Sequence, residues 1–347
     1  MEHGQFKPVN ILLFVSDALP GFHPTGEVKK LSGGNLNLVW RVWGWERSVI
    51  VKYAPPYIAT APDIPLPPRR ILMEAAALRL FDAPLLQTFL SESFRPPRLL
   101  YVDEKKHTLI LEDVGNLPAL DLAGRPYREL GAELGCFLGR LHASTAGNQA
   151  IAGSINNREI QQTRLKVQYA TVRERLKKAG IGNATELGRR AEELGKKYLT
   201  KGKCLIMGDL WPRSILLDNE RKQARLIDWE FAHYGRPAQD IAHFIAHLWM
   251  LRHCTENKER ELALRRLRKA FLESYLANLG PEKSLLLDEE ETADAGIHFG
   301  AEILARTIGT FQNGYLYEGL AHDSNIIRKA VETAVIAMEN PEEIFDM

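Results

Sequence analysis

The first third of the chain has the hydrophobic pattern of β-strands. From Leu36 to Trp40 every second residue is apolar, and the run Ser48-Val-Ile-Val-Lys-Tyr53 is rich in β-branched residues. The strands that these patterns predict lie at residues 36–42, 48–53, 98–102 and 108–112. A proline-rich loop and a segment of strong helix formers, residues 70–78, separate the second strand from the third. We therefore expect a small sheet with one inserted helix.

Beyond residue 127 the apolar spacing becomes that of helices. In residues 127–144, five large apolar side chains recur at intervals of three and four, which places them on one helix face. Residues 157–199 are charged and mainly helical, and the chain is helical again from Pro237 onward. Short strands and turns fill residues 204–231. The sequence therefore predicts an α+β fold, with a small N-terminal lobe at 1–113 and a larger helical lobe at 114–347.

Composition and charge exclude several classes of protein. Among the 347 residues, 45% are apolar and 26% are charged, which is typical of a globular protein. The net charge of +1 gives no electrostatic reason to expect a nucleic acid or an anionic membrane as partner. The three cysteines are far apart and form no C-x-x-C pair, so neither a zinc site nor a disulfide framework is expected.

Targeting signals are also not evident in the sequence. The N-terminus lacks the basic region of a signal peptide, and the apolar stretches at 9–19 and 241–251 are too short and too polar to span a membrane. A cytoplasmic location is therefore the default expectation, for a monomer or a homodimer.

Two apolar segments of the helical part each lead to acidic residues. The first ends in Met207-Gly208-Asp209, and the second in Ile227-Asp228-Trp229-Glu230. Asp228 and Glu230 are two apart, so on an extended backbone both carboxylates point to one side and can share a cation. Mg²⁺ takes one or two carboxylates and leaves positions for phosphate oxygens. The pattern is short, and two solvated acidic turns would also produce it.

The N-terminal lobe contains matching features. Residues 32–37, Ser-Gly-Gly-Asn-Leu-Asn, join two predicted strands, where glycines let the backbone approach phosphates, although a plain hairpin is an equal alternative. Lys52 ends a strand that reads as buried, and a buried lysine needs an anionic partner. Glu74, on the predicted helix, can supply it. In kinases such a pair holds the lysine against nucleotide phosphates.

The order of these features resembles a known family. A glycine turn, a strand lysine, a helix glutamate, a loop aspartate and an acidic pair follow one another as in the aminoglycoside phosphotransferase and choline kinase group of protein-kinase-like small-molecule kinases. Within that group the chain is most similar to 5-methylthioribose kinase and fungal 4-hydroxytryptamine kinase. The stretches that carry the resemblance are residues 34–37, 48–52, 74–78, 207–210 and 227–232, with a weaker match at 302–309.

The resemblance implies a bilobal protein-kinase-like fold and an ATP- and Mg²⁺-dependent kinase that phosphorylates a hydroxyl of a small metabolite. It implies roles for the following residues: Asp209 as catalytic base; Asp228 and Glu230 as Mg²⁺ ligands, with Ser214 as a weak or water-mediated one; Gly33, Gly34, Asn35, Asn37 and Lys52 at the ATP phosphates; Glu74 as the residue that orients Lys52; the main chain of Glu112 and Val114 at adenine; Asp240 as a brace of the catalytic loop; and Arg306, Trp211 and Trp229 at the acceptor.

Departures from the family pattern keep alternatives open. Most relatives have His-Gly-Asp where this chain has Met207-Gly208-Asp209, so the loop must be anchored by packing or by Asp240. A catalytically weak ATP-binding scaffold is one alternative, and a drug phosphotransferase of the same fold is another. The methylthioribose kinases carry an arginine pair where this chain has Ala305-Arg306.

The aromatic and histidine residues of the helical lobe also have two interpretations. Trp211 and Trp229 could stack on an aromatic or amine-bearing acceptor, or they could be core residues. His243 and His247 have the spacing of a zinc pair on one helix face, but they lack the glutamate of H-E-x-x-H and an evident third ligand. We expect these two histidines to be satisfied or exposed without a metal.

Overall fold

The structure is a computed structural model, and it describes residues 8–32, 36–200 and 202–345. Its N-terminal part contains α1 (Pro8–Ala18), β1 (Pro24–Lys30), β2 (Leu38–Gly44), β3 (Ser48–Tyr53), β4 (Tyr57–Ile58), β5 (Ala61–Pro65), α2 (Arg70–Phe81), α3 (Pro84–Gln87), β6 (Phe94–Arg95), β7 (Leu99–Asp103) and β8 (Thr108–Glu112). The strands and the helix predicted for this region are confirmed.

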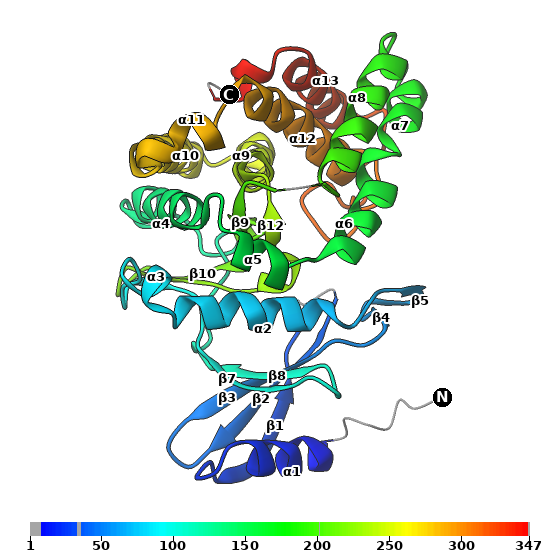
Figure 1. The fold of residues 1–347 in the computed structure, drawn as a ribbon. Helices are drawn as coiled ribbons and strands as arrows, with labels where there is room; N and C mark the ends of the chain where they lie inside the picture. Colours follow the sequence, from blue (N-terminus) through cyan, green and yellow to red (C-terminus); the bar gives the residue numbers. More distant parts are fainter. Residues whose placement is uncertain (1–7, 33–35, 201, 346–347) are drawn as a thin grey trace.

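The remainder is mostly helical, as predicted (Figure 1). It contains α4 (Leu130–Thr145), α5 (Gln149–Ser154), α6 (Arg158–Arg164), the π-helical turn η1 (Leu165–Tyr169), α7 (Val172–Lys178), α8 (Ala184–Lys197), β9 (Cys204–Ile206), η2 (Pro212–Ser214), β10 (Ile215–Asp218), β11 (Gln223–Leu226), η3 (Trp229–Phe231), β12 (His233–Gly235), α9 (Pro237–Cys254), α10 (Lys258–Asn278), η4 (Gly280–Glu282), α11 (Lys283–Leu286), α12 (Glu289–Thr307), α13 (Asn325–Glu339) and η5 (Pro341–Phe345).

A five-stranded antiparallel sheet in the order β1-β2-β3-β8-β7 forms the N-terminal part. Its two faces pack against different helices. Val49 and Val51 of β3 belong to a small core with Ile11 and Val15 of α1, whereas Ile50 packs against the main core on the other face. Figure 1 shows α1 and α2 on opposite sides of the sheet. Because side chains alternate along a strand, Lys52 shares the face of Ile50 and points toward α2.

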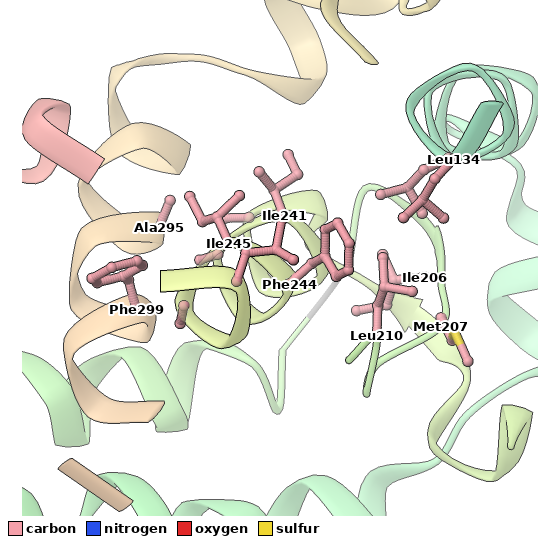
Figure 2. Packing of buried hydrophobic residues seen from close by; sticks show 14 of the residues in the cluster. Leu134, Ile206, Met207, Leu210, Ile241, Phe244, Ile245, Ala295 and Phe299 are labelled. Carbon is pink, nitrogen blue, oxygen red and sulfur yellow. The ribbon is translucent and has the colours of Figure 1, made fainter. Parts of the chain in front are cut away.

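The loops of the helical part begin at a two-stranded ladder of β9 and β12, in which Ile206 pairs with His233. The strands are antiparallel, so the residues that follow Ile206 and those that precede His233 leave the ladder at the same end. The loop at 207–211 and the turn at 228–232 are therefore neighbours. Figure 2 shows Ile206 and Leu210 beside Phe244 of α9, in the main hydrophobic core.

The lobe boundary expected after residue 113 stays a prediction, and a strand pairing crosses it. Strand β6 lies before that boundary, but it pairs in parallel with β11 through Phe94 and Ala224.

Among the helices of the described residues, none combines the length and apolar character that a membrane span requires.

Candidate active site

Lys52 lies at the meeting point of the sheet, α2 and the turn at 228–232. Its Nζ is 2.8 Å from Glu74 Oε2 and 2.7 Å from Asp228 Oδ1. The Lys52 and Glu74 side chains are buried, whereas the Asp228 side chain is 45% exposed. The expected ion pair between Lys52 and Glu74 is thus present, and it extends to a carboxylate open to solvent. An ammonium group has three N–H donors, so one remains for a further anionic partner.

The charges in this region leave a surplus of acid. Three carboxylates, those of Glu74, Asp228 and Glu230, surround the cations of Lys52 and Arg70. Burial raises the pKa of Glu74 to about 7, against the attraction of Lys52, and the two other carboxylates add to the rise. Burial acts to lower the pKa of Lys52, but the neighbouring carboxylates outweigh it and raise that pKa above its usual value. A divalent cation here would offset the surplus charge.

The backbone around Asp228 is not extended, which corrects the premise that Asp228 and Glu230 project to one side of a strand. Asp228 has φ of 66°, a left-handed conformation, and a 3-10 turn follows it. The two carboxylates therefore have different partners. Asp228 contacts Lys52, whereas Glu230 Oε2 accepts hydrogen bonds from Asn37 Nδ2 at 2.7 Å and from Arg70 Nε at 3.2 Å.

A hard divalent cation fits Asp228 better than Glu230. The Asp228 carboxylate is exposed and offers the oxygen ligands that Mg²⁺ prefers. Both contacts of Glu230 go to Oε2, and among the described residues none hydrogen-bonds to Oε1, which is left as a second ligand atom. The Asn37 side chain is buried against Glu230 and Arg70, so in this structure it points to the acidic turn and not to a phosphate site.

Asp240 holds the loop that carries Asp209. Its two carboxylate oxygens accept the N–H groups of Met207 and Gly208, each at 2.7 Å, and the side chain is fully buried. His142 Nε2 of α4 lies 3.4 Å from Asp240 Oδ2. Gly208 has φ of 82°, and a Cβ atom there would lie 2.3 Å from the carbonyl oxygen of Phe231. Only glycine lets the two loops approach this closely.

Asp209 is held in its ionised form by groups on two helices. Arg164 of α6 donates to Asp209 Oδ1, and His243 Nε2 of α9 lies 3.3 Å from the same oxygen. Burial would raise the pKa of Asp209, but His243 and Arg164 outweigh it and hold that pKa well below its usual range. Among the described residues none hydrogen-bonds to Oδ2 of Asp209, since both contacts are made with Oδ1.

Arg306 lies among aromatic side chains next to Asp209. Its guanidinium carbon is 4.8 Å from the ring centre of Trp211, 5.4 Å from Phe311 and 5.5 Å from Tyr315. Its Nε donates to Glu302 Oε1 at 2.7 Å, and Arg306 is among the charges that lower the pKa of Asp209. These three rings form an aromatic cage, and in this structure the Arg306 guanidinium occupies it.

Trp229 belongs to the core and not to an acceptor site. The residue is fully buried, its indole ring lies 4.8 Å from Phe81 and 6.3 Å from Phe137, and its Nε1 donates to the carbonyl of Leu226. The 3-10 turn directs Trp229 inward between α2 and α4. The expectation that Trp229 contacts an acceptor is therefore wrong.

The positions of the other predicted site residues give less information about their roles. The Ser214 hydroxyl is buried and donates to the carbonyl of Trp211, so it is not presented to a metal in this structure. Glu112 ends β8, where Arg95 holds its carboxylate through two hydrogen bonds, and Val114 follows in the link to the helical part. Gly33, Gly34 and Asn35 lie outside the described residues.

His243 and His247 lie with Glu302 in a buried cluster whose ligand atoms are all within 4.8 Å of one another. The carboxylate of Glu302 is already satisfied by hydrogen bonds from Gln168, His247 and Arg306. A cation here would have to compete with the Arg306 guanidinium. The cluster is therefore explained as a hydrogen-bonded network without a metal.

Four residues of the site were not identified from the sequence: Arg70, Arg164, Glu302 and His298. Arg70 and Arg164 carry no local motif, because their contacts with the acidic residues of the site, Glu230 and Asp209, join segments distant in the chain. Glu302 lies within the weaker matching stretch at 302–309. It precedes Arg306 by four residues, which places both on one helix face, so this spacing could have identified the ion pair from the sequence.

Comparison with known proteins agrees with this geometry. The sequence profile of the phosphotransferase enzyme family, APH, matches residues 27–283. A 4-hydroxytryptamine kinase of Psilocybe cyanescens is 28% identical in an alignment of length 302 that covers 79% of this chain and 80% of that protein. A methylthioribose kinase of Bacillus velezensis is 26% identical in an alignment of length 352, gaps included, that covers 91% of this chain and 87% of that protein.

Solved structures show the same fold. A choline kinase of Cryptosporidium parvum superposes with a TM-score of 0.55 at 13% identity, covering 98% of this chain and 97% of the other. An amicoumacin kinase in complex with AMP-PNP and Ca²⁺ superposes with a TM-score of 0.56 at 15% identity, covering 99% of this chain and 94% of the other. The chain therefore belongs to the phosphotransferase enzyme family, and it is a small-molecule phosphotransferase with a protein-kinase-like fold.

Proposed function

We propose that this protein transfers the γ-phosphoryl group of ATP, with Mg²⁺, to a hydroxyl of a small metabolite. The observation that carries the proposal is the position of Lys52, which contacts both Glu74 and the exposed carboxylate of Asp228. A lysine with a free N–H beside a hard oxygen ligand suits the phosphates of a magnesium nucleotide.

Asp209 is suited to orient the acceptor hydroxyl. Its Oδ1 is fixed by Arg164 and His243, and its Oδ2 is left to accept the hydroxyl proton. A carboxylate with a lowered pKa is a weak base, but phosphoryl transfer passes through a loose transition state in which the nucleophile gives up its proton late. Positioning therefore contributes more than basicity.

The charges near Asp209 favour a neutral acceptor. Three carboxylates of this region are each paired with an arginine: Asp209 with Arg164, Glu302 with Arg306, and Asp121 with Arg213. A polycation such as an aminoglycoside has no unpaired acid to bind among these residues. Because Arg306 fills the aromatic cage and can donate to oxygens, a hydroxyl-rich sugar of the methylthioribose type is the first candidate, and a hydroxytryptamine-like aromatic amine the second.

The test is Mg·ATP-dependent release of ADP with a panel of acceptors: methylthioribose, ribose, 4-hydroxytryptamine, choline and kanamycin. Asp209→Asn is the blank, because it keeps the shape of the site and removes the negative charge. Asp218→Asn is the matched control, since the Asp218 carboxylate accepts hydrogen bonds from the backbone and guanidinium of Arg221 in a surface hairpin. We expect one acceptor class to give turnover that Asp209→Asn abolishes and Asp218→Asn keeps.

Three results would oppose the proposal. Turnover that survives in Asp209→Asn would remove Asp209 from the reaction. ATP binding without transfer to any acceptor would favour the alternative of a catalytically weak scaffold, and transfer to kanamycin would favour a drug phosphotransferase.

A further inference from the structure

A row of buried groups ends at Asp209. The hydroxyl of Tyr169 lies 2.6 Å from His298 Nδ1, His298 Nε2 lies 3.1 Å from His243 Nδ1, and His243 Nε2 lies 3.3 Å from Asp209 Oδ1. Tyr169, His298 and His243 are each at most 1% exposed. They come from η1, α12 and α9, so three separate segments of the chain converge behind one catalytic carboxylate.

The protonation states of Tyr169 and His298, at the far end of this row, limit its hydrogen bonds to two directions. Burial raises the pKa of Tyr169, so its hydroxyl keeps its proton, and burial holds the pKa of His298 well below its usual value, so that ring is neutral. When the tyrosine donates to Nδ1 of His298, the single proton of His298 is on Nε2 and points at His243. The Nδ1 atom of His243 is then an acceptor, and its Nε2 carries the proton.

If the hydrogen bonds of the row run in the opposite direction, an Nε2–H of His243 still faces Asp209. If His298 donated to Tyr169, its Nε2 would accept from His243 Nδ1, and a neutral His243 would then turn a lone pair toward the carboxylate. That repulsion is relieved only by a proton on Nε2 as well. Both arrangements therefore present an Nε2–H to Asp209. Among the described residues Nε2 of His243 has no partner with full hydrogen-bond geometry, and the carboxylate oxygen it faces is Asp209 Oδ1 at 3.3 Å.

We propose that His243 is a positioning residue of the phosphoryl transfer, locked by His298 and Tyr169 so that its Nε2–H holds Asp209 Oδ1 and leaves Oδ2 for the acceptor hydroxyl. This inference rests on the proposed function. Arg164 approaches the same oxygen from α6, so the carboxylate is held from two directions. The 3.3 Å contact is longer than an ideal hydrogen bond, and such contacts shorten when the substrate binds.

The row does not carry the substrate proton away. Nε2 of His243 already holds a proton, so it cannot accept another from Asp209. A shift of protons along the row in the direction in which its hydrogen bonds point would deliver a proton to Asp209 and leave a buried tyrosinate, so it cannot take a proton away from Asp209. The proton removed from the hydroxyl therefore stays with Asp209 Oδ2 until it leaves with the product or with water. His243 acts through the orientation of Asp209 and does not react itself.

The first test compares two isosteric replacements of His243. The amide nitrogen of glutamine reaches the place of Nε2, whereas that of asparagine reaches only the place of Nδ1. We expect His243→Asn to lower kcat by about tenfold to a hundredfold, the range expected when a catalytic group is misplaced by up to about 1 Å. The KM for Mg·ATP should change little, and His243→Gln should recover most of the lost kcat. Melting temperatures of both variants show whether stability differs between them. Equal kcat in the two variants would overturn the proposal.

The second test does not depend on activity. Labelling the histidine rings with ¹⁵N and recording two-bond ¹⁵N–¹H spectra identifies which nitrogen carries the proton, and the signals missing in His243→Gln assign His243. A protonated Nε2 supports the proposal, whereas a ring protonated only on Nδ1 refutes it. If the native protein phosphorylates no acceptor, the proposed function fails, but the spectrum still decides whether Nε2–H faces Asp209.

Discussion

Replacing Asp240 with asparagine tests how the catalytic loop is held. Asp240 is fully buried and accepts two backbone N–H groups at 2.7 Å. Asparagine keeps the size of the side chain but has one oxygen instead of two. One N–H keeps a weaker, neutral bond, and the other faces the NH₂ group, a donor against a donor.

The magnitude follows from the two bonds. A hydrogen bond to a charged group contributes roughly 1.5–3 kcal/mol, and a neutral one about 1 kcal/mol. Losing one charged bond and weakening the other should cost about 2–4 kcal/mol of unfolding free energy. At roughly 2 °C per kcal/mol for a chain of this size, the melting temperature should fall by about 4–8 °C. Because Met207 and Gly208 directly precede Asp209, kcat should also fall, by about a hundredfold for a displacement near 1 Å.

Urea unfolding of the native protein, Asp240→Asn and Asp218→Asn measures the free energies, and steady-state turnover measures kcat. Asp218 also accepts a backbone N–H, that of Arg221, but it lies in an exposed hairpin, so its variant should lose under about 1 kcal/mol. The reasoning is refuted if Asp240→Asn unfolds at the same urea concentration as the native protein and keeps its kcat. A loss of stability without a loss of kcat would show that the loop is anchored elsewhere.

Further predictions concern single positions. Lys52→Met should raise the KM for Mg·ATP at least tenfold, because it removes the N–H left for phosphate, and nucleotide titration measures it. Gly208→Ala should abolish turnover in a folded protein, since its φ of 82° and the nearby Phe231 carbonyl exclude a Cβ. Trp229→Ala should cost about 3–5 kcal/mol in urea unfolding, as for other buried aromatic residues, and a smaller loss would contradict its core position. Burial lowers the pKa of His233 to about 4, below the unfolded value of about 6.5. His233 therefore stabilises the fold above pH 6.5, and this contribution is lost as the pH falls toward 4. The loss is about 2 kcal/mol between pH 8 and pH 5, and His233→Asn should reduce the pH dependence by that amount in urea titrations.

The parts of the site that the sequence predicts are those that depend on local geometry. Strand alternation places Lys52 on the face of Ile50, toward the inserted helix, and Glu74 lies on that helix. The pair can therefore be read from the period of the strand and the helix propensity of residues 70–78. The same reasoning fails at Asp228. A left-handed backbone is uncommon for residues other than glycine, so an extended conformation was the reasonable expectation.

The parts that could not be predicted depend on contacts between distant segments. Trp211 and Trp229 both stand next to acidic residues in the sequence, and nothing local distinguishes them. The 3-10 turn buries Trp229 against Phe81, whereas Trp211 contacts Arg306. Arg70 contacts Glu230, which lies 160 residues later in the chain, and the sequence neighbours of Arg70 contain no signal of that contact. Tertiary packing decides each of these positions.

Met207 shows why one departure from a family pattern is weak evidence about activity. From the sequence, the loss of a histidine at this position removes hydrogen bonds and supports a scaffold without catalysis. In the structure the loop is held through the main-chain N–H groups of Met207 and Gly208, which are present whatever the side chain. The Met207 side chain is fully buried in the main core (Figure 2). An imidazole near Asp240 is also present, because His142 reaches it from α4 while its Nδ1 lies 3.0 Å from the hydroxyl of Tyr275. The replacement of histidine by Met207 therefore changes the packing beneath the loop and leaves the anchoring of Asp209 intact, so it gives no reason to prefer a scaffold over a kinase.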